Sequence, residues 1–265
     1  MPGSGTIKFI NSLKQKKLRR QHGLFIIEGE KMVDELMKSP FKIHSVYATG
    51  QWFIERDLDP EDSNGKGCLH RHHYRLCEIK EHELKRISTL TTPNKVLALV
   101  HTPSFTLEPA GLNNSLTLVL DNVQDPGNLG TLIRSADWFG VDTIILSEDS
   151  AEVTSPKVVQ STMGSILRVR YHYLDLPSFL QWPEIKVLPV FGTFTGGPSV
   201  YSVDLPDRGL IILGNESRGI SPEVEKLVTR KISIPPWHRG IRQAESLNIA
   251  IAGSIILSEF RRRMQ

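Results

Sequence analysis

Hydrophobic and polar residues alternate along the N-terminal part of the chain at the spacings of short strands and amphipathic helices. Apolar runs of strand length occur at Leu24–Glu28, Ile43–Ala48, Tyr74–Ile79 and Lys95–His101. Helical periodicity predicts helices at Asn11–Arg20, Glu30–Lys38 and Glu81–Ser88. These elements together predict a small α/β domain over residues 1–101.

The periodicity stops between Thr102 and Ser115. Two prolines, a glycine and two asparagines occupy this stretch, and such residues favour turns over regular elements. We therefore expect residues 102–115 to be a linker and residues 116–265 to form a second domain.

Strand and helix patterns alternate more steadily in this second part. Strands are predicted at Leu116–Leu120, Thr143–Leu146, Leu167–Tyr173, Val187–Phe191, Leu210–Leu213 and Lys231–Ile234. Helices are predicted at Leu129–Phe139, Pro156–Met163, Pro177–Trp182, Pro222–Val228 and Leu247–Arg262. Such alternation predicts an α/β fold with a mostly parallel sheet and helices on both faces.

The stretch from Leu116 to Gly140 indicates where a ligand would bind in this predicted sheet. A buried strand runs into a polar loop rich in Asp, Asn and Gly, and a helix follows. The carboxyl end of a parallel strand is where open α/β sheets bind ligands. Arg134 lies off the apolar face of the helix, so it is free to point into that crevice.

The last predicted helix is apolar around nearly its whole circumference. A helix of this kind is buried on more than one side. We expect the sheet on one side and a second subunit on the other, with a central helix of a monomer as the alternative.

Composition narrows the class of protein. With 265 residues, 39% hydrophobic and 23% charged, the chain matches a globular protein, and no run is long enough to span a membrane. The net charge of +3 is only mildly basic. Basic residues without an acidic one nevertheless cluster near the N-terminus, at Lys8, Lys14, Lys16, Lys17, Arg19 and Arg20. Such a run fits either RNA phosphates or a solvated helix face.

The two cysteines, Cys68 and Cys77, are too few for a disulfide framework and fit a reducing cytoplasm. They flank His70, His72 and His73, which raises the question of a metal site. No C-x-x-C pair is present, and neighbouring arginines would repel a cation. We therefore interpret this segment as a strand that carries histidines, and predict no metal.

Three polar loops follow strands of the second domain and meet at one edge of a parallel sheet. They are Asp125–Arg134, Leu213–Gly219 and Ile234–Asn248. None contains G-x-G-x-x-G, G-x-x-x-x-G-K-[ST] or G-x-S-x-G, which disfavours a nicotinamide dehydrogenase, an NTPase and a serine hydrolase.

The three loops resemble, in order, the motifs of the SpoU/TrmH branch of SPOUT RNA methyltransferases. The matching patterns are N-x-x-D-P-G-N-L-G-x-x-x-R at 122–134, L-G-N-E-x-x-G at 213–219, and I-P followed by E-S-L-N-I-A within 234–250. The resemblance covers essentially residues 116–265. The N-terminal part resembles, more loosely, the ribosomal-protein-like RNA-binding domain that precedes this catalytic domain in many rRNA 2′-O-methyltransferases.

The resemblance implies a C-terminal trefoil knot, bound S-adenosylmethionine, a homodimer formed by the C-terminal domain, and methyl transfer to a ribose 2′-hydroxyl of RNA. Matched positions imply a catalytic set of Asn128, Arg134, Glu216, Ser246 and Asn248. They imply a cofactor-binding set of Leu213, Gly214, Asn215, Glu216, Gly219, Ile234 and Leu247. We expect RNA to contact Lys14, Lys16, Lys17, Arg19, Arg20 and Arg134.

Two features leave the mechanism open. An arginine normally stays protonated, so Arg134 more readily holds a phosphate and stabilises negative charge than acts as a base. The third loop is longer than the resemblance leads us to expect, and Trp237, His238, Arg239 and Arg242 in it are candidates for RNA contact. Taken singly, Asn128, Ser246 and Asn248 are also ordinary helix-capping residues.

We predict a cytoplasmic RNA ribose 2′-O-methyltransferase, with rRNA favoured over tRNA because of the N-terminal domain. A non-catalytic RNA-binding or ribosome-assembly factor on the same scaffold is the main alternative. Methylation of a base instead of a ribose is a further one.

Overall fold

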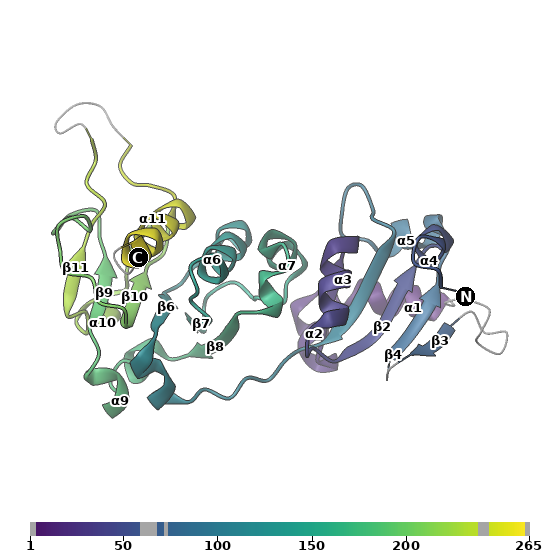
Figure 1. The fold of residues 1–265 in the computed structure, drawn as a ribbon, viewed down its shortest axis with the longest axis horizontal. Coiled ribbons are helices and arrows are strands. Elements are labelled where there is room, and N and C mark those ends of the chain that lie inside the picture. The colour runs from purple at the N-terminus through teal and green to yellow at the C-terminus, as the bar shows by residue number, and fades with distance from the viewer. Residues whose placement is uncertain (1–3, 59–67, 72–73, 238–243, 263–265) are drawn as a thin grey trace. The chain divides into compact units, whose positions relative to one another are not determined.

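The computed structural model describes residues 4–58, 68–71, 74–237 and 244–262 (Figure 1). The chain divides into two compact units. The first comprises Met1–Ser104 and Glu152–Leu167, and the second comprises Phe105–Ala151 and Arg168–Gln265. The segment Glu152–Leu167 thus groups with the N-terminal unit, whereas the sequence pattern assigns it to a continuous second domain.

The N-terminal unit is built on a five-stranded mixed sheet of order β1-β5-β2-β4-β3. Its strands are β1 (Leu24–Glu28), β2 (Ile43–Ala48), β3 (Cys68–Arg71), β4 (Tyr74–Glu78) and β5 (Val96–His101). Only β2 and β4 pair in parallel. The helices are α1 (Ser4–Ser12), α2 (Lys16–His22), α3 (Glu30–Lys38), α4 (Gly50–Ile54), α5 (Glu81–Ile87) and α7 (Pro156–Thr162).

The predicted helix Asn11–Arg20 is wrong, because the chain forms two helices here. Gln15 is extended, with φ −91° and ψ 131°, and separates α1 from α2. Ile7, Ile10 and Leu13 are buried, and they pack into the core on one face of the sheet. Burial of these apolar residues sets the position of α1, whereas the sequence argument followed the basic residues after it.

A disulfide joins neighbouring strands of this sheet. Cys77 is disulfide-bonded, and the register of β3 with β4 places Cys68, the other cysteine of the chain, directly opposite it. Of the nearby histidines, His72 and His73 lie outside the described residues.

The C-terminal unit is built on a six-stranded sheet of order β11-β9-β10-β6-β7-β8. Its strands are β6 (Leu116–Leu120), β7 (Thr143–Ser147), β8 (Arg170–Leu174), β9 (Val190–Thr193), β10 (Gly209–Leu213) and β11 (Arg230–Ile232). All five pairings of these strands are parallel, which confirms the predicted sheet. The strand order reverses at β6 and β10, the kind of position where ligands bind in open α/β sheets.

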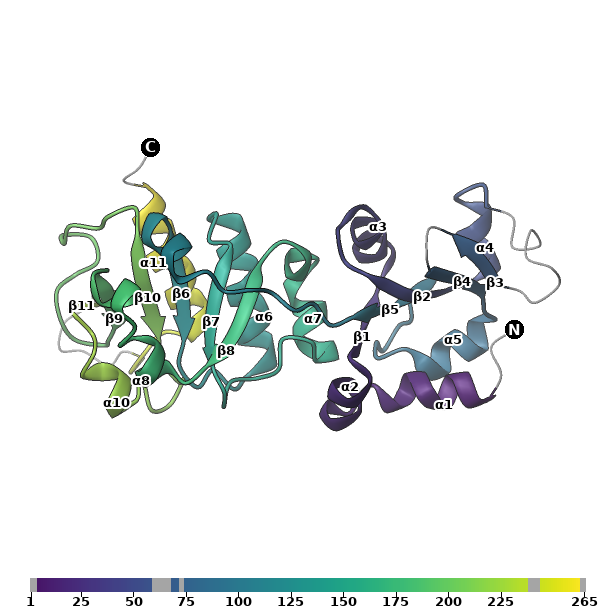
Figure 2. The same ribbon diagram turned by 90° about the horizontal axis from the view of Figure 1, so that it is seen from below.

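Helices cover both faces of this sheet (Figure 2). On one face, α8 (Leu176–Phe179), α9 (Pro183–Lys186) and α10 (Pro222–Glu225) pack on β6, β7 and β10. On the other face lie α6 (Pro126–Trp138) and α11 (Ile249–Arg262), which pack against each other. Successive side chains of a strand point to opposite faces of the sheet. Because most strand residues here are apolar, both faces of the sheet contribute to a hydrophobic core.

Several boundaries differ from the sequence prediction. Strand β8 begins at Arg170, because Ser165–Leu167 forms a short 3₁₀ helix, η2. Strand β9 begins at Val190, and the preceding Val187 is 77% exposed. The predicted linker contains a second 3₁₀ helix, η1 (Pro109–Asn114), which buries Leu112.

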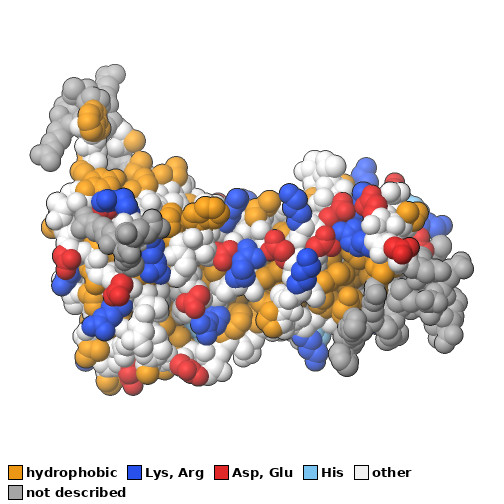
Figure 3. All heavy atoms as spheres, viewed as in Figure 1, with side chains coloured by type: hydrophobic (Ala, Val, Ile, Leu, Met, Phe, Trp, Pro, Cys, Tyr) orange, Lys and Arg blue, Asp and Glu red, His pale blue; other side chains and the backbone are white. Residues whose placement is uncertain are grey.

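Apolar side chains reach the surface over α6 and α11 (Figure 3). Trp138 is 83% exposed, Ile251 54%, and Leu247, just before α11, 48%. The apolar circumference of α11 is thus only partly buried within one chain. No helix in the described part of the chain is both long and apolar enough to cross a membrane.

Candidate active site

The polar loop after β6 leads into α6 through an aspartate cap. Asp125 is the N-cap, and its carboxylate accepts a hydrogen bond of 2.8 Å from the backbone N–H of Asn128. Pro126 follows at the first helical position, where a proline is well tolerated. Asn128 is therefore not the cap of α6, and its side chain is available for other contacts.

The carboxamide of Asn128 joins the three motifs in one chain of hydrogen bonds. Asn248 Nδ2 donates to Asn128 Oδ1 at 2.9 Å. Asn128 Nδ2 donates in turn to Glu216 Oε1 at 3.1 Å. The two bonded pairs are 88 and 120 positions apart in sequence, so the fold, and not local structure, brings them together.

Asn248 also begins α11. Its Oδ1 accepts from the backbone N–H groups of Ala250 and Ile251, at 2.9 and 3.3 Å. The capping alternative considered for this residue is therefore correct, but it is compatible with a place in the site. The cap uses Oδ1 of Asn248 as an acceptor. Its Nδ2 remains available to donate a hydrogen bond to Asn128.

Helices α6 and α11 are held side by side along their length. The hydroxyls of Ser135 and Ser254 lie 2.7 Å apart. At the C-terminal ends, Arg261 Nε donates to the backbone oxygen of Phe139 at 2.7 Å. Together with the contact between Asn128 and Asn248, these bonds define a parallel helix pair in fixed register.

A glycine allows this close packing. A Cβ on Gly253 would lie 2.5 Å from Leu132 Cδ2 and 2.7 Å from Leu213 Cδ1. The missing side chain therefore lets α11 approach α6 and β10 together. An isolated glycine in a helical pattern is a sequence signal for such an approach, which the sequence analysis did not use.

The loop after β10 is held by Asn215. Its Nδ2 donates to the backbone oxygen of Asn122 at 2.8 Å. Its Oδ1 accepts from the backbone N–H groups of Ser217 and Arg218, at 3.0 and 3.1 Å. The side chain of Asn215 is thus committed to bonds within the protein, and it links the first and second motifs.

Two further residues complete this connection. Asn122 adopts a left-handed backbone conformation, with φ +57°, which asparagine tolerates better than most residues. A Cβ on Gly214 would lie 2.1 Å from the backbone carbon of Gly219, so this position requires glycine. Asn122 is absent from the predicted site residues, although its place shortly after the strand Leu116–Leu120 was the available signal.

Arg134 and Ser246 are near these elements without joining the hydrogen-bonded cluster. Both are exposed. Among the described residues, no hydrogen bond or ion pair connects either side chain to Asn128, Glu216 or Asn248. Within the described ranges the guanidinium of Arg134, on the exposed face of α6, has no hydrogen-bond or ion-pair partner.

The predicted cofactor-binding residues differ in exposure. Leu213 is buried, Gly214, Asn215 and Ile234 are half-buried, and Glu216, Gly219 and Leu247 are exposed. Gly219 has φ +72° and open space where a Cβ would lie.

The basic residues near the N-terminus are not equivalent. Arg19 is only 4% exposed, and its guanidinium donates to the backbone oxygens of Leu13 and Lys14 and pairs with Glu152. The predicted RNA contact of Arg19 is therefore wrong, because its guanidinium is buried and already paired within the N-terminal unit. The other five, Lys8, Lys14, Lys16, Lys17 and Arg20, are exposed.

Comparison with known proteins agrees with this arrangement. Residues 115–258 match the model of the SpoU rRNA Methylase family, and residues 5–98 match an MRM3-like substrate binding domain. The chain belongs to the SpoU rRNA methylase family. It is 30% identical to the 23S rRNA (guanosine(2553)-2′-O)-methyltransferase RlmP of Bacillus subtilis, over 96% of this chain and 95% of that protein.

Solved structures of similar proteins share the whole fold. One is a protein from Porphyromonas gingivalis assigned to the TrmH family of RNA methyltransferases. It is 38% identical, with a TM-score of 0.84 over 99% of both chains. Another is an AdoMet-bound rRNA methyltransferase from Sinorhizobium meliloti. It is 26% identical, with a TM-score of 0.81 over 99% of this chain and 96% of that one.

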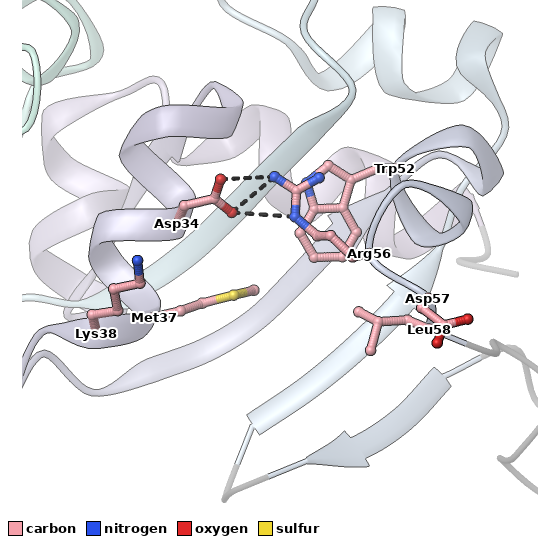
Figure 4. Close-up of a pocket in the computed structure, with 7 residues that line it drawn as sticks. All are labelled: Asp34, Met37, Lys38, Trp52, Arg56, Asp57 and Leu58. Carbon is pink, nitrogen blue, oxygen red and sulfur yellow. Dashed lines mark hydrogen bonds and ion pairs between the residues drawn. The ribbon is translucent and has the colours of Figure 1, made fainter.

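Two pockets lie away from the SpoU motifs. One of about 490 Å³ in the N-terminal unit is lined by Trp52, Arg56 and Asp34, among others (Figure 4). There Arg56 stacks 4.3 Å from the centre of the Trp52 ring and forms a bidentate pair with Asp34. The other pocket, of about 360 Å³, lies beside β11. Neither pocket has a described motif residue in its lining.

Proposed function

We propose that this chain transfers a methyl group from S-adenosylmethionine to a ribose 2′-hydroxyl of rRNA. The observation that carries the proposal is the hydrogen-bonded chain Asn248–Asn128–Glu216, which gathers one residue from each SpoU motif. The names of the similar proteins support the reaction and the substrate class, and a similar structure was solved with AdoMet bound.

The residues around the cluster fit such a cofactor. Adenosine offers an aromatic face and polar edges, and pockets for such ligands combine apolar side chains with a few backbone donors and acceptors. Leu247 is an exposed apolar residue directly before Asn248, and Gly219 leaves open space above its backbone. We propose that Leu213, Gly214, Gly219, Ile234 and Leu247 hold the cofactor, mainly through backbone groups.

When bound, the cofactor supplies a methyl group on a sulfonium, which is transferred to the ribose oxygen as that oxygen loses its proton. The protein must position the hydroxyl and stabilise the negative charge that develops on its oxygen. We assign charge stabilisation and the binding of an RNA phosphate to Arg134, whose guanidinium remains protonated. Glu216, oriented by Asn128, is the carboxylate that we propose as proton acceptor, and we propose that Ser246 contacts the ribose.

We propose that the active form is a homodimer built on the C-terminal unit. Trp138 and Ile251 expose apolar surface on α6 and α11, and large exposed apolar patches mark interaction sites. Light scattering of the wild type should give twice the monomer mass of 29.8 kDa. The variant Ile251→Glu should give the monomer mass, and a monomeric wild type would overturn this part of the proposal.

The remaining assignments extend the same proposal. The N-terminal unit binds RNA, the linker around residues 102–115 connects it to the methyltransferase unit, and the C-terminal segment is threaded as a trefoil knot. Likeness to other SpoU proteins supports all three. The substrate class suggests that the protein works in the cytoplasm.

The decisive experiment maps 2′-O-methyl groups in total RNA from cells with and without this protein. Loss of one rRNA methylation, restored by the wild type and not by Arg134→Ala, is the expected result. A non-catalytic assembly factor would leave the map unchanged, and calorimetry would then show no cofactor binding. A methyl group located on a base, or on tRNA, would correct the substrate assignment.

A further inference from the structure

Four basic side chains gather at one end of the N-terminal sheet, apart from the basic residues near the N-terminus. Three of them come from adjacent strands, in the order β5, β2, β4, and the fourth directly precedes β2. We call this set the basic row; its members are Lys42, His44, Arg75 and His101.

Strand register brings the basic row together. Ser45 on β2 pairs with Arg75 on β4 and with Leu99 on β5. The backbone N–H of His101 donates to the backbone oxygen of Lys42 at 2.9 Å. The rings of His44 and His101 are 5.7 Å apart. Lys42 and Arg75 are exposed, and both histidines are half-buried.

The charges that act on the two histidines are all positive. Burial lowers the pKa of His44, and the charges of His101 and Arg75 lower it further. Burial and the charge of Lys42 lower the pKa of His101. On the remaining neighbour, β1, the residue opposite His101 is the uncharged Leu24. Across the described residues, no hydrogen bond or ion pair gives any member of the basic row a carboxylate partner.

Like charges placed together oppose folding unless something else compensates. Lys95 on the same unit, by contrast, has an acidic partner, because it bonds to Glu55 at 2.6 Å. Uncompensated positive charge focused at one place attracts anions. We propose that the basic row binds phosphodiester groups of the substrate RNA, and that this contact tightens as the pH falls. The inference rests on the proposed function and assigns a second RNA-contact surface to it.

The direction of the pH effect follows from linkage. In the free protein the histidines have pKa values below the usual value of about 6.5, and a bound phosphate raises these values. Between the two pKa values, binding is coupled to proton uptake, so affinity rises as pH falls. Well above the pKa in the complex, and well below that in the free protein, the affinity no longer changes with pH through these groups.

The salt dependence of binding tests the location. Binding of fluorescently labelled, in-vitro transcribed 23S rRNA would be measured for the full-length wild type, Lys42→Gln and Arg75→Gln. Each variant should weaken binding several-fold and reduce the slope of log affinity against log salt by roughly 0.7 to 0.9. Lys31→Gln is the matched control, because Lys31 is an exposed lysine on α3 without a described partner.

The pH dependence tests the histidines. Wild-type affinity should rise several-fold between about pH 7.5 and about pH 6, and His44→Gln/His101→Gln should remove most of this rise. Thermal unfolding of each variant establishes that it is folded. Variants of Lys42 and Arg75 that bind RNA like the wild type would overturn the inference.

Failure of this inference is distinguishable from failure of the proposed function. If the wild type methylates rRNA while the variants bind it normally, only the basic row is misassigned. If the wild type methylates no rRNA, the proposed function is overturned, whatever the binding data show.

Discussion

The side-chain amides of Asn128 and Asn248 meet at 2.9 Å across two neighbouring helices, near the start of each. Asn248 uses one end of its amide to cap α11 and the other to hold Asn128. The beginning of the last helix and the geometry of the site therefore depend on the same side chain. This arrangement makes the two roles experimentally separable.

We expect Asn248→Asp to keep the helix and lose the site. A carboxylate can still accept from Ala250 N–H, so the free energy of unfolding should change little. It cannot donate to Asn128 Oδ1, so the methylation rate should fall about 10- to 100-fold. Asn248→Ala should lose both functions, with a cost of about 1 kcal/mol from the missing cap. Chemical denaturation and single-turnover methylation measure the two effects. Full activity in Asn248→Asp would show that the bond to Asn128 is dispensable.

Arg134 should affect activity without affecting stability, because it is exposed and has no described partner that stabilises the fold. Arg134→Ala should lower methylation by about 10² to 10³, the loss seen when one group that stabilises developing charge is removed. Its thermal unfolding should match that of the wild type. Arg208→Ala, an exposed arginine of the same unit outside the motifs, should remain fully active. Equal activity in the two variants would remove Arg134 from the mechanism.

Gly253 tests whether helix packing sets the site geometry. A valine there would overlap Leu132 and Leu213, and overpacking of this kind costs about 1 to 3 kcal/mol. We expect Gly253→Val to be destabilised and to methylate poorly, because α11 can no longer hold Asn248 against Asn128. Ser258→Val places the same β-branched residue at an exposed position of α11 and controls for helix propensity. A Gly253→Val protein as stable as this control would contradict the packing argument.

The disulfide of Cys77 predicts a difference between oxidised and reduced protein. Denatured without reductant, the chain should show no reactive thiol, whereas after reduction it should show two. A cross-link that closes a short hairpin stabilises by about 2 to 3 kcal/mol, so the N-terminal unit should unfold at lower denaturant once reduced. Cys68→Ala/Cys77→Ala should match the reduced wild type under both conditions. Two reactive thiols in the unreduced protein would contradict the bond.

Motif residues were predictable from sequence because their chemistry is carried by residue type and spacing. Asn128 precedes a predicted helix, Glu216 comes shortly after a predicted strand, and Asn248 is at the start of the last predicted helix. Parallel strands end at a common edge, which brings such positions together. The burial of Arg19 was not predictable, because its partners Leu13 and Lys14 are available only after the chain breaks into α1 and α2 at Gln15. The place of Glu152–Leu167 in the N-terminal unit depends likewise on contacts with distant residues.

The sequence by itself determined the alternating α/β pattern, the parallel C-terminal sheet and the three loops, because local periodicity and turn chemistry specify them. Only the tertiary structure decided that Asn128 is shared between Glu216 and Asn248, that Asn215 links two loops, and that basic groups of three strands lie together. Hydrogen bonds between residues about a hundred positions apart form only when packing of apolar faces has fixed the register of helices and strands. That register is a property of the whole fold, not of any local stretch of sequence.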